Sequence, residues 1–246
     1  MFFSSLFCSR LLYFWLAFQG GHEAAFVSPS QLDLGRMRQG TPVLVMFDNK
    51  QRVGQMVLHI NQRDGQLIVQ DRTSVPGFNI EEKITVTMDA KSRAPITAEV
   101  EAMFGENSLD VDLKWTGHRV TGRLARGPEE KTVNQKLAPD TFTRVALFAL
   151  LPAFAWKEGA AFRVDMFDVM SAKNYSITLL ATEKTKVDVL AGRFEAWRVE
   201  VNGHEVRQAF YISTATPAQT VKIEVLDTSW HYELTHTDVT PVRRDP

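Results

Sequence analysis

The histidine side chains are the first candidates for chemistry, because imidazole binds metal ions and titrates near neutral pH. No two histidines are spaced i, i+2, the spacing that would place both rings on one face of a strand. His231 lies between Trp230 and Tyr232 in an alternating strand, so its side chain is expected on the opposite face, toward solvent. The spacing therefore predicts no metal site, and no cofactor pattern accompanies it. The histidines are His22, His59, His118, His204, His231 and His236.

Nucleophilic catalysis by serine or cysteine would need a sharp, glycine-flanked turn with a base in reach. Ser171, Ser176 and Ser213 lack flanking glycines. Cys8 is the only cysteine, so no disulfide can form within one chain. Glycine-rich phosphate loops and dinucleotide fingerprints are also missing from the sequence. The sequence therefore favours a protein without catalysis over an enzyme.

Carboxylates occur in close pairs, which could act as general acid and base if a cleft perturbed their pKa values. Asp110 and Asp112 lie on the strand face opposite Leu109, Val111 and Leu113, which predicts that they face water. A solvated surface is the expected setting of the other pairs as well. The pairs are Glu81 and Glu82, Asp110 and Asp112, Glu129 and Glu130, and Asp165 and Asp168.

The elements that must position these side chains are strands. In residues 187–225, apolar and polar residues alternate in several short runs separated by turn residues. Asn202-Gly203 is typical of a type I′ hairpin turn, because both residues tolerate a positive φ. Each run is expected to bury one face only. The segment therefore predicts a series of antiparallel strands.

Residues 53–124 repeat this pattern more faintly. In both segments a strand is followed by a short polar connection with a proline, Pro95 or Pro217, and then by another strand. We interpret the pair as a possible duplicated meander in one large curved antiparallel sheet, a half-barrel or open barrel. The alternative is that any all-β chain shows this alternation.

Residues 140–156 differ from the rest, because they are apolar almost all round. Asp140 is the expected N-cap of a short helix, and Pro152 should break or end it. Such a helix must be buried. We expect it to lie in or over the concave face of the sheet, either as ordinary core or as a lid over a ligand cavity.

Length and composition favour one domain. The 246 residues have 44% hydrophobic side chains and a formal net charge of −1. An all-β chain of this size commonly forms one domain, here expected at 26–240 and followed by a disordered tail at 241–246. The balanced charge argues against nucleic acid as a partner.

Residues 1–25 resemble an export signal. Arg10 supplies a thin positive region, residues 11–18 an apolar stretch too short to span a bilayer, and residues 20–25 small side chains near a possible cleavage point. A misassigned start or a segment that lies on a membrane are the alternatives. No later stretch is apolar enough to span a membrane. The expected location is periplasmic or otherwise exported.

Residues 187–225 also carry a family resemblance. The run from Trp197 to Val201, the glycine hairpin, the aromatic strand 210–213, a proline and the run from Val221 to Val225 resemble a bacterial envelope family of unknown function, DUF3108. Its members are similar in architecture to the half-barrels that carry lipoproteins through the periplasm. The resemblance implies an exported β-rich domain, and it transfers no catalytic residue.

These observations favour a non-catalytic binding or carrier module in the cell envelope, whose concave face holds an apolar or lipid-like ligand. Plain core packing is the alternative role of the aromatic residues concerned. The candidate ligand-binding residues are Trp115, Phe148, Phe154, Trp197, Trp230 and Tyr232.

Two other functions remain open. One is a structural protein that binds an envelope partner through a sheet edge, by strand addition. The other, less favoured, is an enzyme with a polar site at the mouth of the sheet. The candidate participants in such a site are His59, His118, Asp165 and His204.

Overall fold

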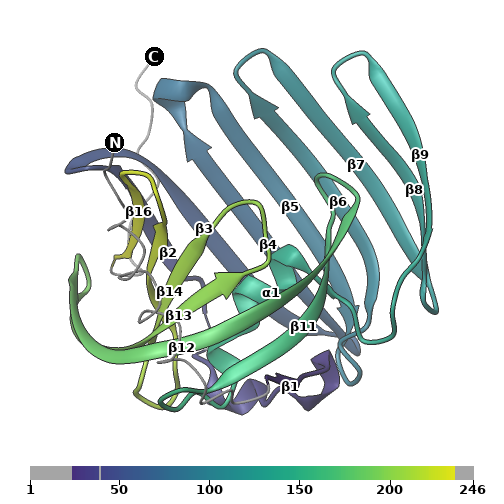
Figure 1. Ribbon diagram of the computed structural model, residues 1–246. Coiled ribbons are helices and arrows are strands. Elements are labelled where there is room, and N and C mark those ends of the chain that lie inside the picture. The colour runs from purple at the N-terminus through teal and green to yellow at the C-terminus, as the bar shows by residue number, and fades with distance from the viewer. Residues whose placement is uncertain (1–23, 39, 236–246) are drawn as a thin grey trace, which may run out of the picture.

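The computed structural model describes residues 24–38 and 40–235 of the chain. All strands in this part of the chain belong to one 16-stranded sheet, which curves around a single short α-helix (Figure 1). The predicted fold, one large curved sheet with a helix on its concave face, is therefore confirmed. Most of the expected leader, residues 1–23, and the tail at 241–246 lie outside the described residues.

The first part of the sheet is an uninterrupted antiparallel meander, in which each strand pairs with the next along the chain. Alternation is plainest in the seventh strand, whose odd-numbered residues 109–115 are buried. Asp110 and Asp112 are exposed there, as predicted. The strands are β2 (Val43–Asp48), β3 (Gln51–Arg63), β4 (Gln66–Val75), β5 (Ile80–Asp89), β6 (Pro95–Phe104), β7 (Asn107–Thr116), β8 (Arg119–Arg126) and β9 (Glu129–Lys136).

A second antiparallel meander follows the helix. Its last strand pairs with β2, the first strand of the first meander, so the end of the second meander meets the start of the first in the middle of the sheet. The strands that precede Pro95 and Pro217 in the predicted repeat are β5 and β14, and each is the fourth strand of its meander. The strands are β11 (Ala161–Asp168), β12 (Lys173–Val189), β13 (Gly192–Asn202), β14 (Gln208–Ser213), β15 (Thr220–Val225) and β16 (Trp230–Leu234).

Two short strands, β1 (Ala25–Phe26) and β10 (Phe142–Thr143), add to β11 in parallel. Single 3₁₀ turns occupy Pro29–Gln31, Leu34–Arg36, Pro76–Phe78 and Leu151–Ala153.

Side chains, and not a strand ladder, link the far end of the first meander to the second. Arg126 of β8 donates to the Met170 carbonyl oxygen over 3.4 Å. Gln135 of β9 donates to the Ala172 carbonyl oxygen over 2.9 Å. Lys131 of β9 donates to the Ser171 carbonyl oxygen over 3.3 Å. These bonds hold the β11–β12 turn against β8 and β9, so the curved sheet comes near to closing around its core.

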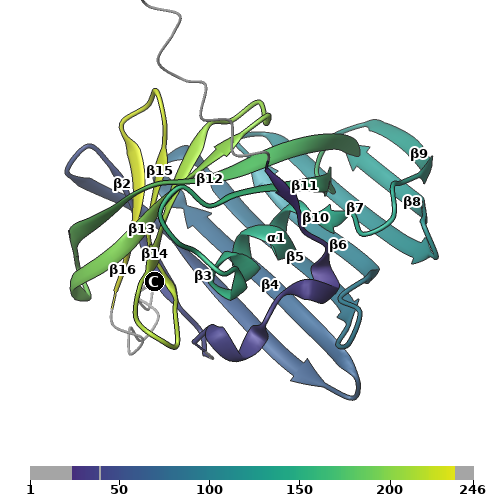
Figure 2. The ribbon, with the colours of Figure 1, turned by 60° about the horizontal axis from the view of Figure 1, so that its bottom comes forward.

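The helix α1 (Arg144–Leu150) lies inside the curve, between the β11–β14 strands and the broad face of the first meander (Figure 2). Val145, Leu147 and Leu150 are buried, and the helix contacts β4, β5 and β11. A helix that is apolar all round has no face for water, so burial is the only stable setting. The helix ends before Pro152, as predicted.

The prediction that Asp140 caps this helix is wrong. Asp140 takes a positive φ of 61° in a turn, and the Thr141 hydroxyl bonds the Ala138 carbonyl. Residues 142–143 then pair with β11 as strand β10, which leaves Thr143 at the N-cap. Strand pairing with β11 satisfies backbone groups that a helix begun at residue 140 would have used.

The β3–β4 hairpin turns at Asp64 and Gly65, which take φ values of 50° and 75°, as a tight hairpin turn needs. The type I′ hairpin expected at Asn202-Gly203 is wrong: Asn202 still pairs with Thr178, and β14 resumes only at Gln208. Gly203 is required for another reason, because a Cβ there would lie 2.8 Å from the Ser176 carbonyl oxygen.

The expectation that each strand buries one face only is wrong for β14, which is buried on both faces from residue 209 to 213. The register of β12 and β13 shifts between Ala181 and Glu183, and the tip of this hairpin bonds back to β16 through Ala191 and Leu234. A second, smaller apolar cluster forms beneath it: Ala196, Tyr211, Val221 and Leu234, with Val187, Val189, Ala191 and Phe194.

Truncation of the helix tests its role as core. Leu147 is fully buried, so Leu147→Ala should lower the free energy of unfolding by about 2–5 kcal/mol, through lost burial and the cavity left behind. Leu190→Ala is the matched control, because Leu190 is 48% exposed and its loss should have little effect. Equal effects of the two substitutions in urea unfolding would contradict this account.

Candidate binding cavity

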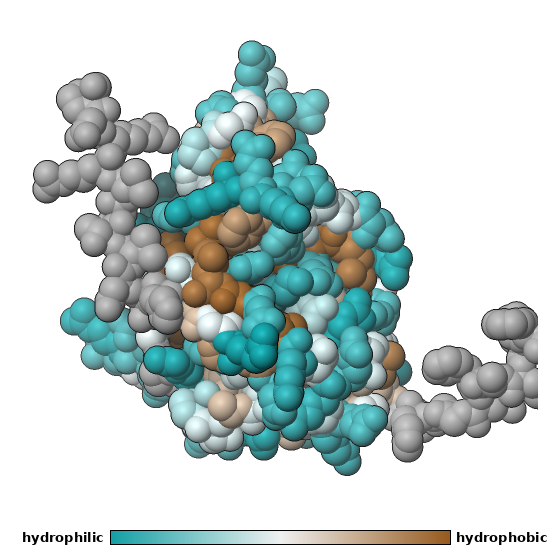
Figure 3. Space-filling view, turned by 90° about the vertical axis from the view of Figure 1, so that its left-hand side faces the viewer, coloured by the Kyte–Doolittle hydropathy of each residue, from teal (hydrophilic) through white to brown (hydrophobic). Residues whose placement is uncertain are grey.

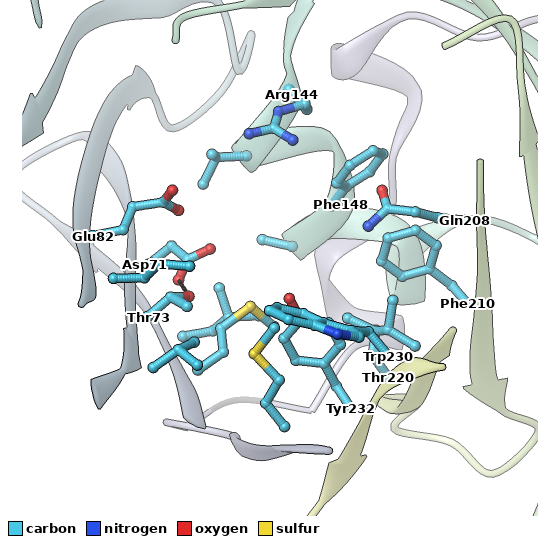
Figure 4. A pocket seen from close by; sticks show the side chains of 18 of the residues that line it. Asp71, Thr73, Glu82, Arg144, Phe148, Gln208, Phe210, Thr220, Trp230 and Tyr232 are labelled. Atoms are coloured by element: carbon cyan, nitrogen blue, oxygen red, sulfur yellow. Dashed lines mark hydrogen bonds between the residues drawn. The ribbon is translucent and has the colours of Figure 1, made fainter. Parts of the chain in front are cut away.

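A cavity of about 260 Å³ lies between α1 and the concave face of the sheet. Both meanders contribute to its wall, because β16 pairs with β2 and so brings the last strand of the second meander beside the first strand of the first. Figure 4 shows the side chains that point into it. The lining residues are Met46, Met56, Leu58, Asp71, Thr73, Val75, Ile80, Glu82, Phe104, Arg144, Val145, Phe148, Ala149, Gln208, Phe210, Thr220, Ile223, Trp230 and Tyr232.

Three of the predicted ligand-binding residues line this cavity. Phe148 comes from α1, and Trp230 and Tyr232 come from β16. The Phe148 ring packs on Phe210 of β14 with 4.8 Å between ring centroids. The structure thus brings aromatic residues of the helix and of the second meander together around one space, as Figure 4 shows.

The other three predicted residues lie elsewhere. Phe154 is core, packed between Phe142 and Trp156. Trp197 packs at the margin of the main core without lining the cavity. Trp115 meets Phe167 edge-on and borders a different cavity of about 220 Å³.

Two carboxyl groups point into the first cavity, Asp71 from β4 and Glu82 from β5 (Figure 4). The expectation that Glu82 is solvated is wrong, because Glu82 shares the inward face of β5 with Ile84 and Val86. Asp168, also expected to be solvated, is buried.

The alternation of inward and outward positions along each strand could have identified Asp71 and Glu82 from the sequence. In β4 the inward positions are Leu67, Val69, Asp71, Thr73 and Val75, so two polar residues interrupt an apolar series. Glu82 interrupts the inward series of β5 in the same way, between Ile80 and Ile84. A polar residue in the buried phase of a strand is more informative than a carboxylate pair adjacent in sequence.

Burial gives both carboxyl groups unusual pKa values. It raises the pKa of Asp71 to about 6, against the lowering effects of the Thr73 hydroxyl, which donates to Asp71 over 3.0 Å, and of the Arg144 charge. Burial, and then the negative charge of Asp71, raise the pKa of Glu82 to about 7. Burial and these two carboxylates also raise the pKa of the Tyr232 hydroxyl to about 12.

Arg144 is the cation of the cavity and stands at the start of α1. Its Nε lies 3.4 Å from Asp168 Oδ1, and its Nη2 donates to the Met170 sulfur over 2.9 Å. Asp168 is itself fixed by the Met170 amide and the Ser171 hydroxyl. Asp168 therefore balances the charge of Arg144 and holds it at the edge of the cavity.

Carboxyl groups that titrate near neutral pH can donate or accept protons. Among the described residues that line this cavity, however, none is Ser, Cys or His. Across the part of the chain that the structure describes, no group of three or more His, Cys, Asp or Glu could hold a metal ion. The arrangement is suited to holding a ligand that is mostly apolar with one polar group.

The four residues suggested for a catalytic site are not brought together. His59 of β3 contacts Thr41, whereas His118 lies in the β7–β8 turn and borders the second cavity. Asp165 lies on β11, and His204 bonds Val206 in the β13–β14 loop. His231 stacks on Phe47 on the face opposite Tyr232 and is only partly exposed.

The fold and the cavity define a class of protein: a β-barrel-like protein whose curved sheet encloses a helix and a partly apolar cavity. The family model for the protein of unknown function DUF3108 matches residues 44–227. The chain belongs to the DUF3108 family, which confirms the resemblance found in the strand series.

A solved structure supports the same fold. The chain is similar to the crystal structure of a β-barrel-like protein of domain of unknown function DUF1849 from Brucella abortus, at 15% identity and a TM-score of 0.54, over 79% of this chain and 94% of that one. At this identity the similarity concerns the fold alone. None of the curated proteins matches the sequence.

Replacing Glu82 tests the burial of its carboxyl group. Its raised pKa means that the folded protein keeps a proton which the unfolded chain has lost, so stability falls as pH rises from the unfolded value of 4.5 to about 7. Glu82→Gln should therefore raise the free energy of unfolding at about pH 8 by on the order of 1–2 kcal/mol, and leave it nearly unchanged at about pH 4.

Urea unfolding at the two pH values measures this difference. Glu99→Gln on β6 is the matched control, because Glu99 is exposed and should show no such pH dependence. The same change in stability for Glu82→Gln at both pH values would contradict the burial of a titrating carboxyl group.

Proposed function

We propose that this protein is a non-catalytic binding or carrier module that holds an apolar or lipid-like ligand between α1 and the sheet. The cavity carries the proposal: Phe148, Phe210 and Ile223 present apolar surface from the helix and the second meander, while a few polar groups lie at one side. Apolar pockets with a small number of placed polar groups are the common form of small-molecule sites.

The apolar lining continues to the surface. Phe78, in the 3₁₀ turn between β4 and β5, is 49% exposed, and its ring lies 5.2 Å from the ring of Trp230. Figure 3 shows the side of the molecule on which β12 and β16 lie; it is hollowed, and apolar side chains gather there among hydrophilic ones. Exposed apolar surface of this kind often marks a binding site.

We further propose that the protein works in the cell envelope after export. The sequence of residues 1–25, with its single Arg10 and short apolar stretch, supports this proposal. In the described residues no helix has the length and apolar character needed to cross a membrane. Fractionation of cells that express the full chain tests the location: recovery in the envelope or periplasmic fraction is expected, and recovery with cytoplasmic markers would contradict it.

Strand addition by an envelope partner is the weaker candidate. Strand β9 has β8 as its only neighbour among the described strands. Its sequence is rich in charge, with Glu129, Glu130, Lys131 and Lys136, and charged side chains on an edge strand disfavour pairing with another chain.

Ligand binding can be tested by narrowing the cavity. Thr220 lies on β15 and faces it, so Thr220→Phe should reduce the affinity for a hydrophobic dye or fatty acyl probe by about tenfold or more, because the larger ring takes the ligand's place. Thr121→Phe on the exposed face of β8 is the matched control and should bind as the wild type does.

Extraction of the purified protein with organic solvent, followed by mass spectrometry, adds an independent test. A copurifying apolar compound that is lost in Thr220→Phe is the expected result. Release of no such compound, together with no binding of either probe by the wild type, would contradict the proposal.

A further inference from the structure

The two carboxyl groups of the cavity lie on one side of it, and this position limits the chemical class of ligand that the cavity can bind. Asp71 and Glu82 project from neighbouring strands, and Phe148, Phe210 and Trp230 lie across the space from them (Figure 4). A ligand that fills the cavity would therefore meet carboxyl groups at one end and aromatic rings at the other.

Charge balance favours a cation at the carboxyl end. The charged and titratable groups around the cavity come from five elements: Asp71 of β4, Glu82 of β5, Arg144 of α1, Asp168 of β11 and Tyr232 of β16. Arg144 is paired with Asp168 at 3.4 Å. The Arg144 charge also acts on Asp71 and Glu82, so one cation faces three carboxyl groups among these residues.

Hydrogen bonding agrees with the charge balance. Glu82 points into the cavity and accepts no hydrogen bond from any residue that the structure describes (Figure 4). Gln208 Oε1, on the opposite wall, is enclosed without a hydrogen-bond partner among these residues; so is Arg144 Nε, which has only its ion pair with Asp168. An enclosed acceptor without a donor costs free energy, which a ligand that supplies an N–H group would recover.

The aromatic wall is compatible with such a group. Tyr232 lies near both carboxyl groups, whose charges act on its hydroxyl, and the face of an aromatic ring attracts cations. A ligand with an anionic head would face two carboxyl groups, and the cation of the cavity, Arg144, is already paired with Asp168.

We propose that the cavity selects amphiphiles with a positively charged ammonium group, which Asp71 and Glu82 bind while the apolar chain packs against Phe148, Phe210 and Trp230. This inference rests on the proposed function, that the cavity holds an apolar ligand. It adds the chemical class of the polar group.

Calorimetric titration with three probes of equal chain length tests the selection: decylammonium, decanol and decanoate. At about pH 8, where both carboxyl groups are ionised, decylammonium should bind about tenfold more tightly than either of the others. As pH falls to about 5 the carboxyl groups take up protons, so this preference should decline, although the alkylammonium group stays charged throughout.

Variants identify the groups responsible. Glu82→Gln and Asp71→Asn keep the shape of each side chain and should each reduce the preference for decylammonium several-fold, while decanol binds as before. Glu99→Gln on the exposed face of β6 is the control and should keep the full preference. If one cavity variant does not fold, the other variant and the pH series on the wild-type protein still decide the outcome.

The outcomes separate the two proposals. Equal or tighter binding of decanol or decanoate overturns the selection for ammonium and leaves the proposed function standing. Binding of none of the three probes overturns both. A preference for decylammonium that survives in both cavity variants assigns it to other groups and also overturns the inference.

Discussion

The burial of α1 is the interaction on which the rest of this structure depends. A sheet of 16 strands that curves this strongly has a concave face too wide for its own side chains to fill. Val145, Leu147 and Leu150 supply the missing apolar volume from inside the curve. The helix is too short to be stable alone, so it and the sheet stabilise each other. The closing bonds from β8 and β9 to the β11–β12 turn keep the two sides of the curve around it.

The cavity is a consequence of the same packing. Arg144 begins the helix and is held by Asp168 of β11, so the helix fills one part of the concave face and leaves a space beside β4, β5 and β16. The carboxyl groups of Asp71 and Glu82 then lie in a place from which most water is excluded, and burial raises their pKa values to about 6 and about 7. Keeping two such groups inward weakens the fold near neutral pH, a cost commonly found at binding sites.

Much of the fold could be predicted from the sequence, because strands that face water on one side show their period directly. The alternation around Val111 and the apolar segment 140–156 predicted the sheet and the buried helix. The start of the helix and the turn after Asn202 could not, since both depend on pairing with distant strands, β11 and β12. Aromatic type alone did not separate Phe148, which lines the cavity, from Phe154, which is core.

The site itself was only partly predictable. Trp230 and Tyr232 could be proposed as aromatic lining, but their meeting with Asp71 and Glu82 follows from the pairing of β16 with β2, which no local pattern encodes. Glu82 carries the central claim, that a partly buried carboxyl group without a hydrogen-bond partner among the described residues binds a cationic ligand. A carbon-13 NMR titration of its carboxyl group tests this most directly. The account predicts a pKa near 7 in the free protein, which falls when decylammonium binds. A value at its ordinary 4.5, unchanged by decylammonium, would contradict it.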